Sequence, residues 1–273
     1  MRVRAPASTA NLGPGFDCLG AALSVALEID SEATDELPKI VRRAIREGSG
    51  DDDAPATGVI RSDIPSARGL GSSAACVAAG LVLGCVRKGR DIDRAELVRL
   101  GTTIEGHPDN VAAALYGGIT LVLPDGSVMR FEPSGGVRPI VLVPSESLAT
   151  KEARKALPDD VPRTDAVANV ARASGLLSML TGAAAPTPDA LLECTEDRIH
   201  QPYRAPLMTR TFDAIAMLRE QGIAAAVSGA GPSVVCLVIR GAEEPVRQTA
   251  AGMEGWTLLE CDWALEGTVV LDG

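Results

Sequence analysis

The sequence predicts an α+β fold that is divided into two lobes. Segments with the alternating polarity of strands are interspersed along the whole chain with segments whose apolar residues recur at helical spacing. A shift in composition near Ser145 predicts a boundary there, with an N-terminal lobe of residues 1–144 and a C-terminal lobe of residues 145–273. The length of 273 residues is sufficient for two lobes with a sizeable core.

The first part of the chain is expected to contain two strands and a helix. Arg2–Ala7 alternates in polarity and favours a strand, whereas Thr9–Gly20 is rich in Gly and Pro and is expected to be a loop. Leu37–Glu47 has apolar residues at helical spacing, which predicts a helix. A polar, acidic break at Gly48–Thr57 separates it from a strand expected at Val59–Ile64.

The middle of the chain predicts two helices followed by a hairpin. A long apolar helix is expected at Ser73–Arg87. Asp93, with Glu96 three residues later, has the spacing of a capping box and marks the start of the second helix. Strands at Gly118–Leu123 and Val128–Phe131 flank a turn.

The C-terminal half continues in the same mixed pattern. Strands are expected at Ile140–Val143, Ala224–Ser228, Ser233–Ile239 and Trp256–Cys261. Helices are expected at Ala166–Leu180, from Asp189, at Thr211–Gln221 and at Glu243–Ala251.

Composition and charge argue against several classes of protein. Asp and Glu number 36 against 26 Lys and Arg, so the net charge of −10 disfavours nucleic-acid and anionic-membrane partners. No apolar run reaches the roughly 20 residues that span a bilayer, and no secretory segment is recognisable, so a cytoplasmic location is expected. The six cysteines form no C-x-x-C pair and are interpreted as buried thiols, and two histidines argue against a His-based zinc site.

The segment Pro65–Ala75, which reads PSARGLGSSAA, is the main candidate for a ligand-binding loop. Glycines let a backbone fold tightly around an anion, and a following helix offers its positive end. Three interpretations remain open on the residues alone. The segment could be a strand-to-helix turn with Ser72 as the N-cap, a weak dinucleotide fingerprint from Gly69 to Ala74, or a nucleotide phosphate loop other than Walker A.

Five further segments combine polar and small residues. They are Pro6–Asp17 (PASTANLGPGFD), Glu105–Val111 (EGHPDNV), Thr150–Arg154 (TKEAR), Asp197–Arg204 (DRIHQPYR) and Ser228–Ser233 (SGAGPS). On composition alone, the first segment is compatible with ordinary turn chemistry and the second with a solvated loop. Isolated arginines such as those of the next two segments are usually solvated, and the last segment is compatible with a tight hairpin or bulge.

Together these segments resemble, in unbroken order from Val3 to about Ile239, the motifs of the GHMP kinases, and their spelling resembles that of the homoserine kinases among them. The resemblance implies a two-lobe fold, with an N-terminal mixed sheet-and-helix lobe that binds ATP and a ferredoxin-like C-terminal lobe. It implies transfer of a phosphoryl group from ATP to the hydroxyl of L-homoserine, with Mg²⁺ as cofactor. The Ser228–Ser233 motif is implied to pack against the phosphate loop.

The resemblance also implies roles for particular residues. The ATP phosphates would lie against Pro65, Arg68, Gly69, Leu70, Gly71, Ser72, Ser73, Ala74 and Ala75. Mg²⁺ would be held by Ser73 and Glu105. The acceptor would be bound by Asn11, Asp17, His107, Asp109, Asn110, Thr150, Arg154 and Arg204.

Within that acceptor site, Asp17 would pair with the ammonium of homoserine, and Arg154 and Arg204 with its carboxylate. Asn110 would orient the hydroxyl, so Asn110 and Asp17 are the candidate catalytic residues, and the use of a general base stays open. Where the family carries an Asn-Leu-Val string near the adenine, this chain reads Leu37–Val41, so adenine contacts are not assigned.

Three alternatives are carried forward. They are a mevalonate-type GHMP kinase, a non-catalytic binding protein with the same fold, and a dinucleotide-binding oxidoreductase. The expected partner is the small-molecule substrate, with no nucleic acid and no membrane. A homodimer is a possible assembly.

Overall fold

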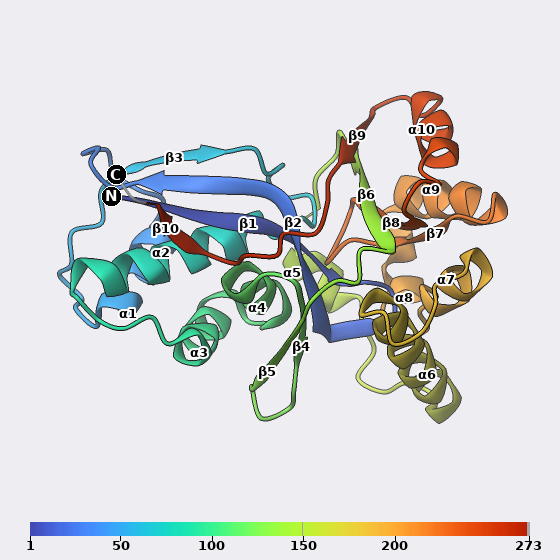
Figure 1. Ribbon diagram of the computed structural model, residues 1–273, viewed down its shortest axis with the longest axis horizontal. Coiled ribbons are helices and arrows are strands. Elements are labelled where there is room, and N and C mark those ends of the chain that lie inside the picture. The colour runs from blue at the N-terminus through green and yellow to red at the C-terminus, as the bar shows by residue number, and fades with distance from the viewer. Residues whose placement is uncertain (149, 272–273) are drawn as a thin grey trace.

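The computed structural model describes residues 1–148 and 150–271 and contains two sheets with helices packed against them (Figure 1). The first sheet has the strand order β10-β1-β2-β4-β5, and β3 also pairs with β2. Its strands are β1 (Arg2–Asn11), β2 (Gly15–Asp30), β3 (Val59–Ser62), β4 (Ile119–Val122), β5 (Val128–Phe131) and β10 (Val269–Leu271). The long β2 holds both β3 and β4 at one edge, because β4 pairs with Leu19–Ala21 and β3 with Leu27–Asp30.

The expectation of a loop over Thr9–Gly20 is wrong. β1 continues to Asn11 and β2 begins at Gly15, with Ala10 opposite Gly20 in an antiparallel ladder. Glycine at position 20 allows a close approach of β2 to the helix α4 (Asp109–Tyr116), because a Cβ there would lie 2.5 Å from the carbonyl oxygen of Asp109. The hairpin of β1 and β2 therefore places the Pro6–Asp17 motif near α4.

Four helices cover one face of the first sheet (Figure 1). They are α1 (Lys39–Ser49), α2 (Ser72–Arg87), α3 (Arg94–Glu105) and α4 (Asp109–Tyr116). Asp93 caps α3 as expected, because its carboxylate accepts hydrogen bonds from the backbone of Ala95 and Glu96. The helix α4 was not expected, and its first residues, Asp109 and Asn110, are buried, so the solvated-loop interpretation of that segment is wrong.

The second sheet has the order β7-β8-β6-β9 and is antiparallel throughout. Its strands are β6 (Val137–Pro144), β7 (Ala224–Val227), β8 (Val234–Ile239) and β9 (Trp256–Glu260). The helices of this part are α5 (Thr150–Lys155), α6 (Arg163–Leu180), α7 (Pro188–Cys194), α8 (Gln201–Arg204), α9 (Thr209–Glu220) and α10 (Glu244–Ala251), with a 3₁₀ turn at Ala205–Leu207. Along the chain, β6 is followed by helices, then by β7 and β8, then by α10 and β9, and β6 lies beside β8 in the sheet. This is the expected ferredoxin-like arrangement.

The division into lobes at residues 144 and 145 stays a prediction, and the strands do not follow it at two places. β6 ends at Pro144 but lies in the second sheet. β10 returns to the first sheet, where Leu271 pairs with Arg2. β10 is an edge strand of the first sheet, whereas β6 lies between β8 and β9 in the second sheet. Neither exchange is visible in local composition.

The core is built from Ala, Val, Leu and Ile, as the low aromatic content predicts. All six cysteines are free thiols, and three of them are buried, with burial raising the pKa of Cys236 to about 12. Within the described part of the chain, no helix combines the length and the apolar character that crossing a bilayer requires.

Candidate active site

The glycine-rich loop lies between β3 and α2 and exposes the start of that helix. Gly69 and Gly71 have positive φ angles of 75° and 63°, a conformation that favours glycine. Gly71 is the N-cap of α2 and makes no side-chain capping bond, which contradicts the interpretation of Ser72 as the N-cap. The first N–H groups of a 16-residue helix are therefore available to an anionic ligand.

A small cavity of about 100 Å³ lies against this loop. It is lined by residues 67–74 and by Glu105, His107, Asn110, Thr150, Gly229 and Ala230. The structure thus brings three other predicted motifs together around the glycine-rich loop, although they are far apart in the sequence. Thr150 reaches the cavity from the first turn of α5.

The predicted Mg²⁺ ligands meet beside the loop. Ser73, in the first turn of α2, donates a hydrogen bond of 2.6 Å from Oγ to Oε1 of Glu105, the last residue of α3. A hydroxyl and a carboxylate at this distance are the oxygen donors that Mg²⁺ prefers. The pair therefore fits a divalent cation between the chain and bound phosphates.

The Ser228–Ser233 turn packs directly on the loop, as the resemblance implies. Ser228 donates from Oγ to the carbonyl oxygen of Gly69 over 2.7 Å. A Cβ on Gly69 would lie 2.2 Å from the carbonyl oxygen of Ser228, so no larger residue fits without movement. The loop is thereby positioned by a segment of the second sheet.

Arg68 does not point its donors at a phosphate position. Nε donates to the carbonyl oxygen of Pro144, Nη1 to that of Ser66, and Nη2 to that of Ser145. The predicted role of Arg68 in phosphate binding is replaced in this geometry by a link between the loop and the end of β6. The side chains of Leu70, Ala74 and Ala75 are buried in the core, so these positions offer only backbone to a ligand.

Asn11 and Asp17 lie in strained backbone at the turn between β1 and β2. Their φ angles are 66° and 58°, in the left-handed region that non-glycine residues rarely adopt. The Asn11 amide donates to the carbonyl oxygen of Gly229 over 2.8 Å, and its oxygen accepts from the backbone N–H of Asp17 over 3.0 Å. Asn11 thus positions Asp17 and joins the first motif to Gly229, instead of presenting a free amide.

Asp17 and Arg154 form a bidentate ion pair. Nη1 of Arg154 donates to Oδ2 of Asp17 over 2.9 Å, and Nη2 donates to Oδ1 over 2.5 Å. Each side chain is 34% exposed, so solvent and ligands can reach the pair. The two residues predicted to bind opposite charges of one substrate are therefore adjacent and satisfy each other.

Arg204 is buried and already binds protein groups. Its Nε donates to the carbonyl oxygen of Ala153, and Nη1 donates to that of Gly229 and to Nδ1 of His200. Nη2 has no hydrogen-bond partner among residues 1–148 and 150–271. One nitrogen of Arg204 is therefore left for the predicted contact with a carboxylate.

His200 and Phe16 support these arginines. Burial lowers the pKa of His200, which is neutral, donates from Nε2 to the carbonyl oxygen of Gly13 and accepts from Arg204 at Nδ1. Its ring stacks on Phe16 at 5.1 Å between centroids. The guanidinium carbons of Arg154 and Arg204 lie 5.7 Å and 5.3 Å from the centroid of the Phe16 ring, so the aromatic face stabilises both cations.

His107, Asp109 and Asn110 form a second polar group at the start of α4. Oδ1 of Asp109 is 2.9 Å from Nδ1 of His107 and accepts from the backbone N–H of Asn110 over 2.7 Å. Burial lowers the pKa of His107, but the hydrogen bond to Asp109 and its charge outweigh burial, so the pKa is raised above its usual value. Asp109 therefore fixes its neighbours, whereas His107 and Asn110 reach the cavity.

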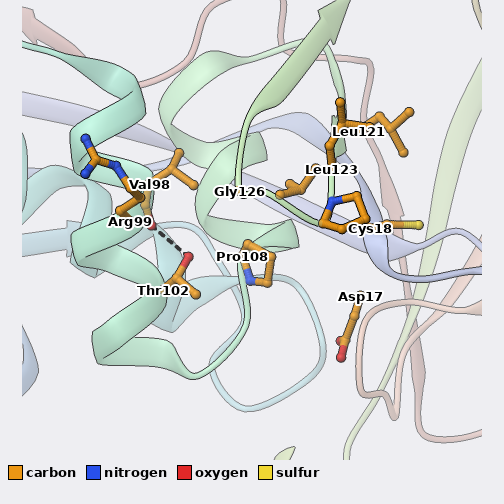
Figure 2. A pocket seen from close by; sticks show the side chains of 11 residues that line it. Asp17, Cys18, Val98, Arg99, Thr102, Pro108, Leu121, Leu123 and Gly126 are labelled. Carbon is orange, nitrogen blue, oxygen red and sulfur yellow. Dashed lines mark hydrogen bonds between the residues drawn. The ribbon is translucent and has the colours of Figure 1, made fainter.

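The largest cavity, of about 670 Å³, is a different feature (Figure 2). It lies between α3 and the β4–β5 hairpin and is lined mainly by apolar side chains such as Val98, Leu121 and Leu123. Asp17 stands at its edge and turns its carboxylate away from Leu121 and Cys18 (Figure 2). Asp17 is thus the one predicted acceptor residue among the eleven that line this apolar cavity.

Sequence reasoning missed three residues that hold the site together, of which two are buried and Phe16 is half-buried. Ser8 binds Asn110, Thr9 binds Ser228, and Phe16 supports the arginines. All three lie within the Pro6–Asp17 motif, so the motif itself was the signal. Their partners lie more than a hundred residues away in all three cases, and local pattern does not identify them.

Comparison with known proteins identifies the class. The family model described as "GHMP kinases N terminal domain" matches residues 36–118, and the model described as "GHMP kinases C terminal" matches residues 180–250. Together the two models match more than half of the chain. The chain therefore belongs to the GHMP kinase family.

Several similar proteins belong to one group within the GHMP kinases, the homoserine kinases. A homoserine kinase from Streptomyces avermitilis is 39% identical over 99% of this chain and 95% of that protein. A homoserine kinase from Streptomyces coelicolor is 41% identical over 87% of this chain and 84% of that protein. The crystal structure of homoserine kinase from Cytophaga hutchinsonii matches with a TM-score of 0.79 at 24% identity, covering 99% of this chain and 97% of that chain, and supports the shared fold. Within the GHMP kinases, the sequence is similar to homoserine kinases along nearly its whole length.

Proposed function

We propose that this protein is an ATP-dependent kinase that phosphorylates the side-chain hydroxyl of L-homoserine, releasing ADP and O-phospho-L-homoserine. One observation carries the proposal: His107 lines the cavity at a loop with free helix N–H groups, and its pKa is influenced by the charge of Arg154, which forms an ion pair with Asp17. The loop suits phosphates, and the charge pair suits a zwitterionic amino acid. The similarity to homoserine kinases along the chain supports the same activity.

The ATP phosphates are proposed to bind at the loop. The backbone of Gly69 to Ser73 and the start of α2 would contact the β- and γ-phosphates. Ser73 and Glu105 would hold Mg²⁺, which when bound supplies positive charge to the phosphate oxygens. Among the described residues, no group of three or more His, Cys, Asp or Glu side chains could hold a metal ion, which suits an ion held largely by phosphates and water.

The acceptor is proposed to bind by exchanging ion pairs. Its ammonium would pair with Asp17 and its carboxylate with Arg154 and Nη2 of Arg204. Entry of the zwitterion then replaces the Asp17–Arg154 pair with two new pairs and leaves neither Asp17 nor Arg154 unpaired. An acceptor that lacks either charge would break the existing pair without this compensation, which favours an amino-acid alcohol over mevalonate.

Phosphoryl transfer is proposed to rely on positioning and charge. A bond forms between the acceptor oxygen and the γ-phosphorus, and the bond from that phosphorus to the oxygen of ADP breaks. Asp17 would be paired with the ammonium in the complex, so the hydroxyl proton is proposed to pass to an oxygen of the transferred phosphoryl group. Asn110 would hold the hydroxyl in line, and His107 and Thr150 would contact the acceptor from the cavity wall.

The test is ADP release with Mg-ATP and L-homoserine, compared with mevalonate and with no acceptor. We expect turnover with homoserine alone, and none when Mg²⁺ is removed. Turnover with mevalonate and not with homoserine would replace the proposal by the mevalonate-type alternative. ATP binding without turnover for any acceptor would favour the non-catalytic alternative, and NAD binding without ATP binding would favour the oxidoreductase. A homodimer stays a prediction, which light scattering tests.

A further inference from the structure

Ser8 lies where the first strand meets both the phosphate loop and α4. Its side chain is completely buried on β1. Its backbone N–H donates to the carbonyl oxygen of Leu70 over 3.2 Å, and its Oγ donates to Oδ1 of Asn110 over 2.9 Å. A Cβ on Gly71 would lie 1.9 Å from this Oγ, so the loop closes directly over the hydroxyl.

The hydrogen bonds of Asn110 fix the orientation of its amide. A serine hydroxyl can donate or accept, so Ser8 alone is compatible with either orientation of the amide. Oδ1 of Asp109 lies 3.3 Å from Nδ2 of Asn110, and an ionised carboxylate only accepts. In the flipped orientation, the amide oxygen of Asn110 would face that carboxylate oxygen. Ser8 and Asp109 together therefore hold Oδ1 toward Ser8 and Nδ2 toward Asp109.

This orientation determines what Asn110 offers to a ligand. Its oxygen is occupied by Ser8, and one hydrogen of Nδ2 is directed at Asp109. The second hydrogen of Nδ2 has no acceptor within the part of the chain that the structure describes. Asn110 lines the cavity beside the phosphate loop. The amide can thus contribute a donor there, whereas its acceptor is already in use.

We propose that Ser8 is a positioning residue that, together with Asp109, holds Asn110 with an N–H, and not its C=O, toward the acceptor hydroxyl: Ser8 anchors the amide oxygen, and Asp109 excludes the flipped orientation. This inference rests on the proposed function. The acceptor oxygen then receives a hydrogen bond from Asn110, and its own proton is directed at another group. Asn110 cannot take that proton, which agrees with its passage to a phosphoryl oxygen during transfer. Ser8 contributes without touching either substrate.

The first test observes the Asn110 amide directly. The chain has three asparagines, Asn11, Asn110 and Asn169, so a sample labelled with ¹⁵N-asparagine gives three side-chain NH₂ pairs. The pair that Asn110→Ala removes belongs to Asn110. In Ser8→Ala we expect the Asn110 pair to shift, because the amide oxygen loses the hydrogen bond that Ser8 donates to it. An unchanged Asn110 pair in a folded Ser8→Ala protein would overturn the inference, whatever the activity.

The second test is a double-mutant cycle. Ser8→Ala is expected to lower kcat for homoserine about tenfold and to leave the KM for ATP within about twofold. In the Asn110→Ala background the same change should have no further effect on kcat, because Ser8 acts through Asn110. A Ser8→Ala loss of equal size in both backgrounds would show a general structural role and overturn the inference.

A matched control separates this effect from loss of stability. Ser49 is also a buried serine, and its Oγ donates to the carbonyl oxygen of Arg46 at the end of α1, but it does not line the cavity. Ser49→Ala should lower thermal stability without changing kcat. Failure of the wild-type protein to phosphorylate homoserine would overturn the proposed function separately, since the NMR test of Ser8 does not depend on turnover.

Discussion

Replacement of Gly69 by alanine tests the central contact of the site. Gly69 has a φ of 75°, and a Cβ there would lie 2.2 Å from the carbonyl oxygen of Ser228 and 2.9 Å from the backbone nitrogen of Gly231. Ordinary contact begins near 3.4 Å, so the loop and the Ser228–Ser233 turn must separate by about 1 Å. A displacement of about 1 Å near reacting groups costs roughly 100-fold in rate, or about 2.7 kcal/mol of activation free energy.

The positive φ contributes a separate cost. A left-handed conformation costs an L-residue roughly 1–2 kcal/mol, which lowers the free energy of unfolding wherever the residue lies. Gly89→Ala provides a matched control, because Gly89 has a φ of 64° and a Cβ added there would meet no other atom within 4 Å. Both variants should therefore lose stability, and only Gly69→Ala should lose activity.

The assay measures kcat/KM for Mg-ATP at saturating homoserine, together with thermal unfolding of both variants. We expect Gly69→Ala to fall about 100-fold below Gly89→Ala in kcat/KM. If the two variants agree within about threefold while both are folded, the loop does not need its contact with Ser228, and the reasoning is refuted.

Three further predictions follow from individual side chains. Arg154→Ala should raise the KM for homoserine by about 10- to 100-fold, because charge-assisted hydrogen bonds are lost, and should change the KM for ATP little. Equal effects on both KM values would contradict the pairing of Arg154 with the acceptor. Arg68→Ala should lower thermal stability but change the KM for ATP by less than about threefold, because the Arg68 donors bind backbone carbonyls. A much larger increase in the KM for ATP would indicate that Arg68 does contact phosphate. His200 is held neutral by burial, so below its ordinary pKa of 6.5 the unfolded chain binds a proton that the folded protein does not, and stability should fall as the pH drops. In a His107→Gln variant the one remaining histidine NMR signal should titrate below pH 6.5, and a midpoint above 6.5 would contradict the buried neutral state.

Local signals accounted for much of the fold. The helix that follows the glycine-rich loop, the cap at Asp93 and the strands of the second sheet all depend on residues within a few positions of each other, and these predictions were confirmed. Ser73 and Glu105 were correctly placed together. The loop expected at Thr9–Gly20 failed because glycine and proline usually interrupt strands, whereas here a long ladder and close packing on α4 outweigh that preference.

The sequence by itself determined the α+β class, the order of the motifs and the residue types that meet at the phosphate loop, because backbone propensity and motif spacing are local properties. Tertiary structure alone decided how the polar side chains are used. Asp17 binds Arg154 across 137 positions, and Ser8 binds Asn110 across 102, so neither partner lies within reach of a local pattern. A buried donor must find an acceptor, and in the folded chain Arg68 and Arg204 donate to backbone carbonyl oxygens. Every residue has a carbonyl, so residue type does not indicate which one will accept. The same long-range pairing places β6 and β10 in sheets that composition does not indicate.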